Sequence, residues 1–535
     1  MKLSPYFLGF FNLFLALSGC SHPDDVDQKD KKQVRLYLQT SPFSLDPRIG
    51  VNRISSNVTR HLFEGLFRID QEGKYRPALA KSVTISEDRC VYTFKLHASK
   101  WSNGEEVTAY DFEYAWKSIL NPDFPSAFSY LFYNIKNAIE AYKKKCSIDD
   151  VGIKSIDSHT LQVTLQHPTP FFLELVANPA FSPLPPSCRE KENWAQKAFP
   201  EYVSNGPFVL KKHALNSQII LERNPFYWNP SPPETDTISF TIVEDPQTAY
   251  NMFCTGDLDW FGEPCGYVPL NMLHGLHSEA FYKKDIGQCT WLQCQIETPL
   301  LKSLKVRRAI ATAIDRDVIC NQLLKCGEKP AYSILPTFLT LLDRPLFKNG
   351  NKTEARSLFE KGLKACGYTR KNCPPLTLLH TSDQMLQSIA GLIQKQLEQA
   401  LGITIILEEC DHNALLSRVF SGDFQLALSD WFSLYCDPMY TLNCFKYKEF
   451  RMIGSPWENK DYIAFLNKVD AAKTTQERQK YLKKAEEKVV KQLPVIPIIY
   501  KNYKYLPPHH LQGYALSDIG QMEFKWAHKT QQKAA

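Results

Sequence analysis

Cysteine is the residue type with the most capacity for chemistry here, because fifteen cysteines occur among 535 residues. Thiolates bind metals best in closely spaced pairs, but the chain has no CxxC, and pairs such as Cys289 with Cys294 and Cys366 with Cys373 are farther apart. His274 and His277 lack thiol or acidic neighbours in sequence. We therefore expect no metal site and no cofactor.

Disulfide bonds are the other use of these thiols. Fifteen cysteines less Cys20 leave fourteen, an even number that suits an oxidising compartment. Disulfides are therefore a possibility, although sequence alone does not give their connectivity.

Motifs of common catalytic sites are missing from the chain. There is no GxSxG elbow, no HExxH pair and no P-loop. Scattered Ser, His and Asp residues occur in any chain of this length. The sequence therefore predicts that the protein is not an enzyme.

Composition indicates a large globular protein. Hydrophobic residues make up 44% of the chain, which is enough for a large core and for more than one domain. The formal net charge of +6 is mild beside 63 basic and 57 acidic residues. No basic stripe with interleaved aromatic residues is present, so we expect no nucleic-acid partner.

The N-terminus has the pattern of an export signal. Lys2 precedes a short apolar run over 6–17, which small residues and Cys20 follow. An uncleaved anchor helix is the alternative. The sequence Leu-Ser-Gly-Cys resembles a bacterial lipobox, which implies a signal peptide over 1–19, lipid on Cys20 and a flexible polar tether over 20–32.

The segment 94–116 predicts a strand, a turn and a capped helix in direct succession. Residues 94–96 alternate between apolar and polar, and Asn-Gly within 101–104 favours a tight turn. Thr108 with Asp111 has the spacing of a capping box, and apolar residues then recur at helical spacing.

Elsewhere, strands and helices alternate, which predicts an α/β protein with mixed sheets. Further strands are expected over 34–38 and 403–407, and further helices over 55–66, 306–320, 388–402 and 476–492.

The segment 94–116, with KWSNGEEVTAYDFEYAW inside it, resembles the signature of family 5 of bacterial extracellular solute-binding proteins, which includes the oligopeptide and dipeptide receptors of ABC importers. The similarity extends from about residue 34 to 525. It includes Leu-Asp-Pro at 45–47, Phe-Glu-Gly-Leu at 63–66, Asn-Gly-Pro-Phe at 205–208, and the segments 221–228, 255–259 and 306–320.

This resemblance implies a bilobed periplasmic-binding-protein fold, α/β with mixed sheets, in which two lobes close around a ligand. The hinge is expected near 287–292 and 498–504. The expected domains are a lobe 1 core formed by 33–63, 189–288 and 503–535, an extra domain of lobe 1 over 64–188, and lobe 2 over 289–502.

The same resemblance implies where a peptide binds. In the family an extended peptide adds a strand between the lobes, so that backbone hydrogen bonds hold it. Trp431 opens a stretch that matches the family motif W-x-x-D-x-x-[DE]-P, and its indole is expected to line the cleft, with a core Trp as the alternative. The expected ligand-binding residues are Arg53, Ser55, Tyr130, Tyr133, Asp430, Trp431, Phe432, Ser433, Leu434 and Asp437.

Leu434 departs from this family pattern. The family has an aspartate at this place, which pairs with the α-ammonium of the peptide, and leucine cannot do so. Either another acid serves, with Asp437, Asp430 and Asp411 nearest in sequence, or the ligand lacks a buried free amine. Asp437 also has a structural interpretation, as a cap or turn residue before Pro438.

Two further departures lie nearby. Leu428 stands where some oligopeptide-binding relatives have an arginine. Arg418 could meet a carboxylate instead, or could lie on an exposed helix. The family cysteine after the Trp is Phe432, although its partner is retained as Cys289, so a bond between Cys289 and Cys436 is a possibility to check.

The sequence therefore predicts a lipid-anchored, monomeric receptor at the periplasmic face of the cell membrane. It would capture short peptides and deliver them to an ABC permease in the inner membrane. The alternatives are a modified peptide such as glutathione, another solute, or a surface lipoprotein with an adhesin role.

Overall fold

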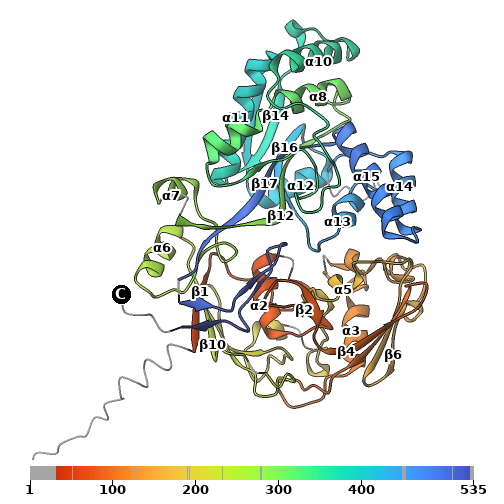
Figure 1. Ribbon diagram of the computed structural model, residues 1–535, viewed down its shortest axis with the longest axis vertical. Coiled ribbons are helices and arrows are strands. Elements are labelled where there is room, and N and C mark those ends of the chain that lie inside the picture. The colour runs from red at the N-terminus through yellow and green to blue at the C-terminus, as the bar shows by residue number, and fades with distance from the viewer. Residues whose placement is uncertain are drawn as a thin grey trace, which may run out of the picture.

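A computed structural model describes residues 32–530, except 51, 127, 190, 192, 232, 277–279, 447, 449–453 and 509. The predicted signal peptide, the lipidation site Cys20 and the tether up to residue 31 lie outside the described residues. The molecule has a lower and an upper lobe, each built on its own main sheet (Figure 1).

The lower lobe is built on a four-stranded sheet of order β1-β10-β9-β8. Its strands are β1 (Gln33–Leu38), β8 (Phe208–Ala214), β9 (Gln218–Arg223) and β10 (Thr237–Ile242). Helix α2 (Arg53–Leu62) packs against β8 and against β20 (Met522–Glu523). The N- and C-terminal parts of the described chain therefore meet in this lobe.

A second four-stranded sheet, of order β4-β5-β7-β6, adjoins the lower lobe. Helix α3 (Ala109–Ile119) covers β6 and β7. The carboxylate of Asp111 accepts a hydrogen bond of 2.8 Å from the backbone N–H of Thr108, which confirms the predicted capping box. The strands are β4 (Ala80–Ile85), β5 (Val91–Leu96), β6 (Ile153–Asp157) and β7 (Thr160–Thr164).

The upper lobe is built on a seven-stranded mixed sheet of order β11-β17-β12-β16-β14-β15, with β13 paired to β17. Figure 1 shows helices around this sheet, with α14 and α15 side by side at one end. The bounds are β11 (Phe261–Gly262), β13 (Lys329–Pro330), β14 (Leu376–Thr381), β15 (Ile405–Cys410), β16 (Leu426–Phe432), α8 (Leu304–Ala313), α10 (Lys352–Ala365), α11 (Gln384–Leu401), α12 (His412–Ser421), α14 (Lys460–Asp470) and α15 (Thr475–Gln492).

Two long antiparallel strands, β12 (Tyr282–Cys294) and β17 (Val495–Leu506), run from one lobe to the other (Figure 1). Their register shifts between Asp285 and Cys289, so the pairing is irregular between the lobes. The expected hinge segments, 287–292 and 498–504, lie within these strands. The exact domain boundaries stay a prediction.

The remaining strands and α-helices are short. They are β2 (Phe67–Ile69), β3 (Tyr75–Pro77), α4 (Ala138–Tyr142), α5 (Phe172–Leu175), α6 (Pro246–Cys254), α7 (Leu270–Gly275), α9 (Arg316–Val318), α13 (Pro438–Asn443), β18 (Leu511–Gln512), β19 (Ala515–Leu516) and β21 (His528–Lys529); short 3-10 helices, such as the one at Ser129–Phe132, lie between them.

Two predicted helices have other limits than expected. The helix expected over 306–320 breaks after α8, because the Asp315 side chain accepts hydrogen bonds from the N–H groups of Asp317 and Val318 and starts α9. The helix expected over 55–66 ends at Leu62. Apolar spacing alone did not reveal either boundary.

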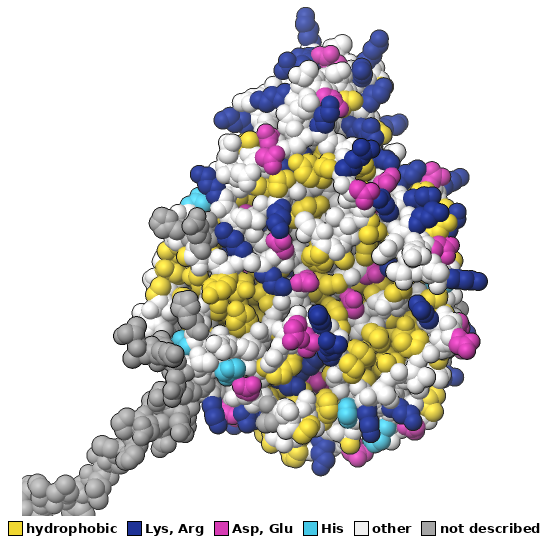
Figure 2. Space-filling view, viewed as in Figure 1, with side chains coloured by type: hydrophobic (Ala, Val, Ile, Leu, Met, Phe, Trp, Pro, Cys, Tyr) yellow, Lys and Arg dark blue, Asp and Glu magenta, His cyan; other side chains and the backbone are white. Residues whose placement is uncertain are grey.

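One hydrophobic core runs through both lobes and contains the buried Trp101, Trp116, Trp260 and Trp291. On the face drawn in Figure 2, hydrophobic side chains gather in patches at mid-height, and Lys and Arg side chains project from the upper end. Among the described helices, none has both the length and the apolar character that a membrane span requires.

Candidate ligand-binding site

The segment predicted to bind ligand begins in strand β16 and ends at helix α13. Strand β14 pairs with β16 only at Leu426 and Ala427, whereas β12 pairs with β16 up to Phe432. Among the described strands, none pairs with the other edge of β16 from Leu428 to Phe432. This edge is free to accept an additional strand.

Asp430 and Trp431 have partners within the upper lobe. The carboxylate of Asp430 accepts hydrogen bonds from Thr290 (2.6 Å) and pairs with the Lys501 ammonium (2.7 Å). Burial lowers the pKa of Lys501, but the charges of Asp430, Asp383 and Glu263 together outweigh burial, and the net pKa is raised. Trp431 stacks on Trp291 with ring centroids 5.2 Å apart, and its indole N–H donates to Thr441 (3.0 Å).

Asp437 caps helix α13, as its structural interpretation predicted. Its Oδ1 accepts a hydrogen bond of 2.9 Å from the N–H of Met439 and lies 2.7 Å from Nη2 of Arg478. The carboxylate of Asp437 therefore already binds the N-terminus of α13 and a cation.

Leu434 lines a small cavity of about 40 Å³ between the lobes, which we call the arginine cavity. Two arginines face it, and no carboxylate is among the described residues that line it. These residues are Asn52, Arg53, Ser56, Asn57, Arg60, Phe128, Asn178, Phe432, Ser433, Leu434, Ile519, Gly520 and Gln521.

Arg53 and Ser55 lie close in sequence but in different surroundings. The Arg53 guanidinium donates a hydrogen bond to Tyr503 and lies 5.3 Å from the ring centroid of Phe432, which belongs to the upper lobe. Ser55 is fully buried, and its hydroxyl accepts a hydrogen bond from the N–H of Ser44 (3.4 Å). The side chains that line the arginine cavity therefore include Arg53 but not Ser55.

A larger cavity of about 320 Å³ lies between the extra sheet region and the upper lobe, and we call it the aromatic cavity. The Tyr130 and Tyr440 hydroxyls are 3.3 Å apart across it, and Phe171 stacks on Tyr435 at 4.5 Å. It is lined by Tyr130, Leu131, Tyr133, Asn134, Ile139, Gln166, His167, Pro168, Thr169, Pro170, Phe171, Tyr435, Met439, Tyr440, Asn443, Cys444, Lys446, Val469, Asp470 and Arg478.

Further contacts hold the lobes together beside these cavities. The carboxylate of Glu174, on α5, accepts a hydrogen bond of 2.9 Å from the N–H of Cys436. Burial raises the pKa of Glu174 above its ordinary value. The two lobes thus touch on both sides of Leu434, and the structure is that of a closed molecule.

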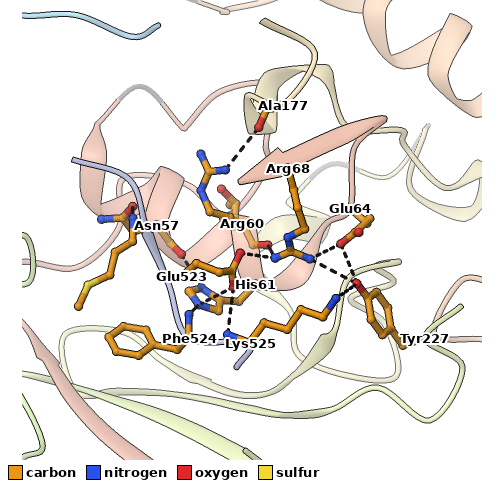
Figure 3. Close-up of polar contacts among 12 residues, drawn as sticks. Asn57, Arg60, His61, Glu64, Arg68, Ala177, Tyr227, Glu523, Phe524 and Lys525 are labelled. Atoms are coloured by element: carbon orange, nitrogen blue, oxygen red, sulfur yellow. Dashed lines mark hydrogen bonds and ion pairs between the residues drawn. The ribbon is translucent and has the colours of Figure 1, made fainter. Parts of the chain in front are cut away.

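A buried charged network lies behind the arginine cavity (Figure 3). Arg68 pairs with both Glu64 and Glu523, and His61 accepts a hydrogen bond of 3.0 Å from the N–H of Phe524. Burial lowers the pKa of His61, which keeps the ring neutral, with Nδ1–H donating to the backbone of Asn57.

The structure also shows the surroundings of the other residues that depart from the family pattern. Arg418 meets carboxylates of the protein itself, Glu408 and Asp423, and Leu428 is fully buried. Each of the fourteen described cysteines is a free thiol. The structure therefore has no disulfide among the described cysteines, and the possible bond between Cys289 and Cys436 is not formed. Among the described residues, no group of His, Cys, Asp or Glu has the arrangement of a metal site.

Sequence reasoning missed Arg60 and the aromatic partners Phe171 and Tyr440. The one available signal for Arg60 was its helical spacing from Arg53 and Ser56, which places all three on one face of α2.

Comparison with known proteins identifies the family. The profile of the bacterial extracellular solute-binding proteins, family 5 Middle, matches residues 74–450. The chain belongs to this family. It is 31% identical over 518 residues to the oligopeptide-binding protein OppA of Bacillus subtilis, covering 96% of this chain and 95% of that protein.

Solved structures agree with this assignment. The periplasmic oligopeptide-binding protein OppAIV of Borrelia burgdorferi has 28% identity and a TM-score of 0.81, with 94% of this chain and all of that chain covered (100%). The murein tripeptide binding protein MppA of Escherichia coli has 25% identity and a TM-score of 0.83, with coverages of 94% and 99%. The bilobed fold expected from the sequence is therefore confirmed.

Proposed function

We propose that this protein is the solute-binding component of an ABC importer and that it holds a short peptide or a peptide-like solute between its lobes. The observation that carries this proposal is the edge of β16 between Leu428 and Phe432, which pairs with no described strand. It ends at Phe432 in the arginine cavity, and Tyr435, three residues on, lines the aromatic cavity. An extended ligand would pair its backbone with this edge and place side chains in the cavities.

Family membership and the relatives support this proposal. The Listeria monocytogenes OppA structure, 26% identical to this chain, is described as bound to peptide. The aromatic cavity, at about 320 Å³, is near the small end of the usual range for ligand pockets, which favours short ligands.

Delivery and anchoring complete the proposal. Lipid on Cys20 would hold the protein at the periplasmic face of the membrane, and the closed form would present the solute to a permease, because the ligand favours closure by differential affinity. Cys20→Ala should move the protein from the membrane fraction to the soluble fraction. If Cys20→Ala stays in the membrane fraction, another segment anchors the protein.

Calorimetry with short peptides tests binding directly. We expect a tripeptide to bind, and scattering to show a smaller radius of gyration when it is added, because the lobes close. Binding should tolerate N-acetylation, because Leu434 cannot pair with an ammonium. A tripeptide mixture that gives neither heat nor compaction would contradict the proposed function, and a strong loss on acetylation would contradict only the account of Leu434.

A further inference from the structure

The guanidinium of Arg60 is buried, and no described carboxylate forms a hydrogen bond or an ion pair with it, although the charge of Glu523 acts on it from farther away. Arg60 is 4% exposed, and the one hydrogen bond of its guanidinium within the described chain is a long contact of 3.4 Å from Nη1 to the backbone oxygen of Ala177. Its Nε is buried without a hydrogen-bond acceptor among the described residues. A buried charge without a partner is strongly unfavourable, so an acceptor from outside the chain would stabilise this site.

The nearest carboxylates serve another cation. Arg68 binds both Glu64 and Glu523, and Figure 3 shows the Arg60 guanidinium turned away from them towards Ala177. Lys525 adds a third cation to the same network, although burial lowers its pKa to about 8. Arg60, Arg68 and Lys525 therefore outnumber the two carboxylates of this network.

Arg60 faces the arginine cavity, where other groups also favour an anion. Arg53 lies on the same wall, and the first turn of α2 contains no acidic residue, so the positive end of this helix is uncompensated. The hydroxyl of Ser433 is buried without a partner among the described residues. The cavity of about 40 Å³ has room for a carboxylate group or a few waters.

Leu434 forms part of the opposite wall and offers neither charge nor hydrogen bond. An acid at this position could pair with the arginines of the opposite wall. Leucine cannot, so only an anionic group of the ligand would pair with them. The cavity should therefore favour an anion, whereas a site that holds an ammonium favours a cation.

We propose that the arginine cavity binds a carboxylate of the ligand, with Arg60 as the main contact and Arg53 at the rim. The solute is then a short peptide or peptide-like molecule with a negative charge at the end that lies beside Leu434. This inference rests on the proposed function and specifies the ligand class of the same site. Burial lowers the pKa of Arg60 to about 10, so the guanidinium remains charged at neutral pH.

Three tripeptides that differ only at the N-terminus test this inference by calorimetry on the wild-type protein. One has a free amine, one is N-acetylated and one is N-succinylated, so that only the last places a carboxylate at that end. We expect the succinyl peptide to bind about tenfold or more tighter than the acetyl peptide, as a charge-assisted bidentate hydrogen bond requires.

Equal affinity for the acetyl and succinyl peptides would overturn the inference and leave the proposed function standing. If none of the three binds, the proposed function fails and the inference falls with it. These two failures are therefore distinguishable.

Variants assign the effect to Arg60. Arg60→Met keeps the length of the side chain and should abolish the preference for the succinyl peptide, whereas Arg223→Met, at a surface ion pair with Asp236, should retain it. If Arg60→Met does not fold, Leu434→Asp supplies Arg60 with an internal carboxylate and should abolish the preference instead, with Leu434→Asn as its control. A preference that survives in Arg60→Met, or in Leu434→Asp, would overturn the assignment.

Discussion

Asp437 gives the clearest test of the site, because this acid lies near Leu434 in sequence but has structural partners. The carboxylate caps α13 through the N–H of Met439 and pairs with Arg478 at 2.7 Å. The side chains of Asp437 and Arg478 are 10% and 15% exposed, so the pair is largely shielded from water. Substitution should therefore reduce stability and leave ligand recognition nearly unchanged.

The size of the effect follows from these contacts. Asp437→Asn keeps an oxygen for the cap but breaks the ion pair, and a loss of about 2–3 kcal/mol is expected, somewhat below the value for a fully buried pair. Asp437→Ala also removes the cap, which adds about 1 kcal/mol.

Urea unfolding measures these losses, and Arg478→Met with the double variant completes a cycle. The coupling between Asp437 and Arg478 should be about 2 kcal/mol, because each single variant breaks the same pair. Affinity for a tripeptide with a free amine should change by about threefold or less, under 1 kcal/mol. If Asp437→Asn unfolds like the wild type but no longer binds that peptide, Asp437 is the amine partner and our reasoning is wrong.

Three further predictions concern the cavities and the buried network. Leu434→Asp should bind a free-amine tripeptide more tightly in calorimetry, by less than the roughly 30-fold of a full desolvated charge pair of about 2 kcal/mol, because Arg60 shares the new carboxylate; an equal gain in Leu434→Asn would contradict this. Thermal stability should fall as the pH drops below 6.5, because the unfolded chain protonates at His61 while the lowered pKa keeps that ring neutral in the fold. His61→Gln should have a flatter pH profile, and an unchanged slope would count against the assignment. Tyr130→Phe removes one hydroxyl of the 3.3 Å contact with Tyr440 and should weaken ligand binding by roughly two- to tenfold, the value of one hydrogen bond; Tyr440→Phe should give no further loss in the double variant, and an additive loss would refute a shared contact.

Local sequence information predicted the elements that depend on neighbouring residues. The segment 94–116 gave the end of β5, the Thr108 cap and α3, because each of these features is decided within a few residues. The helices expected over 388–402 and 476–492 correspond to α11 and α15 for the same reason. The position of Leu434 beside a cavity came from the family resemblance and not from residue patterns.

Other features depend on contacts between distant segments. Trp431 meets Trp291 only because β12 and β16 pair in one particular register, which the sequence does not state. Arg60 belongs to a helix face that could equally have been solvated. Its burial depends on distant residues, such as Ala177, Leu434 and Gln521. Tertiary packing, and not local preference, therefore decides the charge of the cavity.

The free edge of β16 has a consequence for the empty protein. An exposed strand edge can pair with any extended backbone, including the same edge of another molecule. When the lobes open without a solute, Leu428–Phe432 becomes a surface for self-association, and Phe432 adds an exposed ring at its end. In the proposed binding mode a bound solute would cover this edge and so protect its own receptor from aggregation.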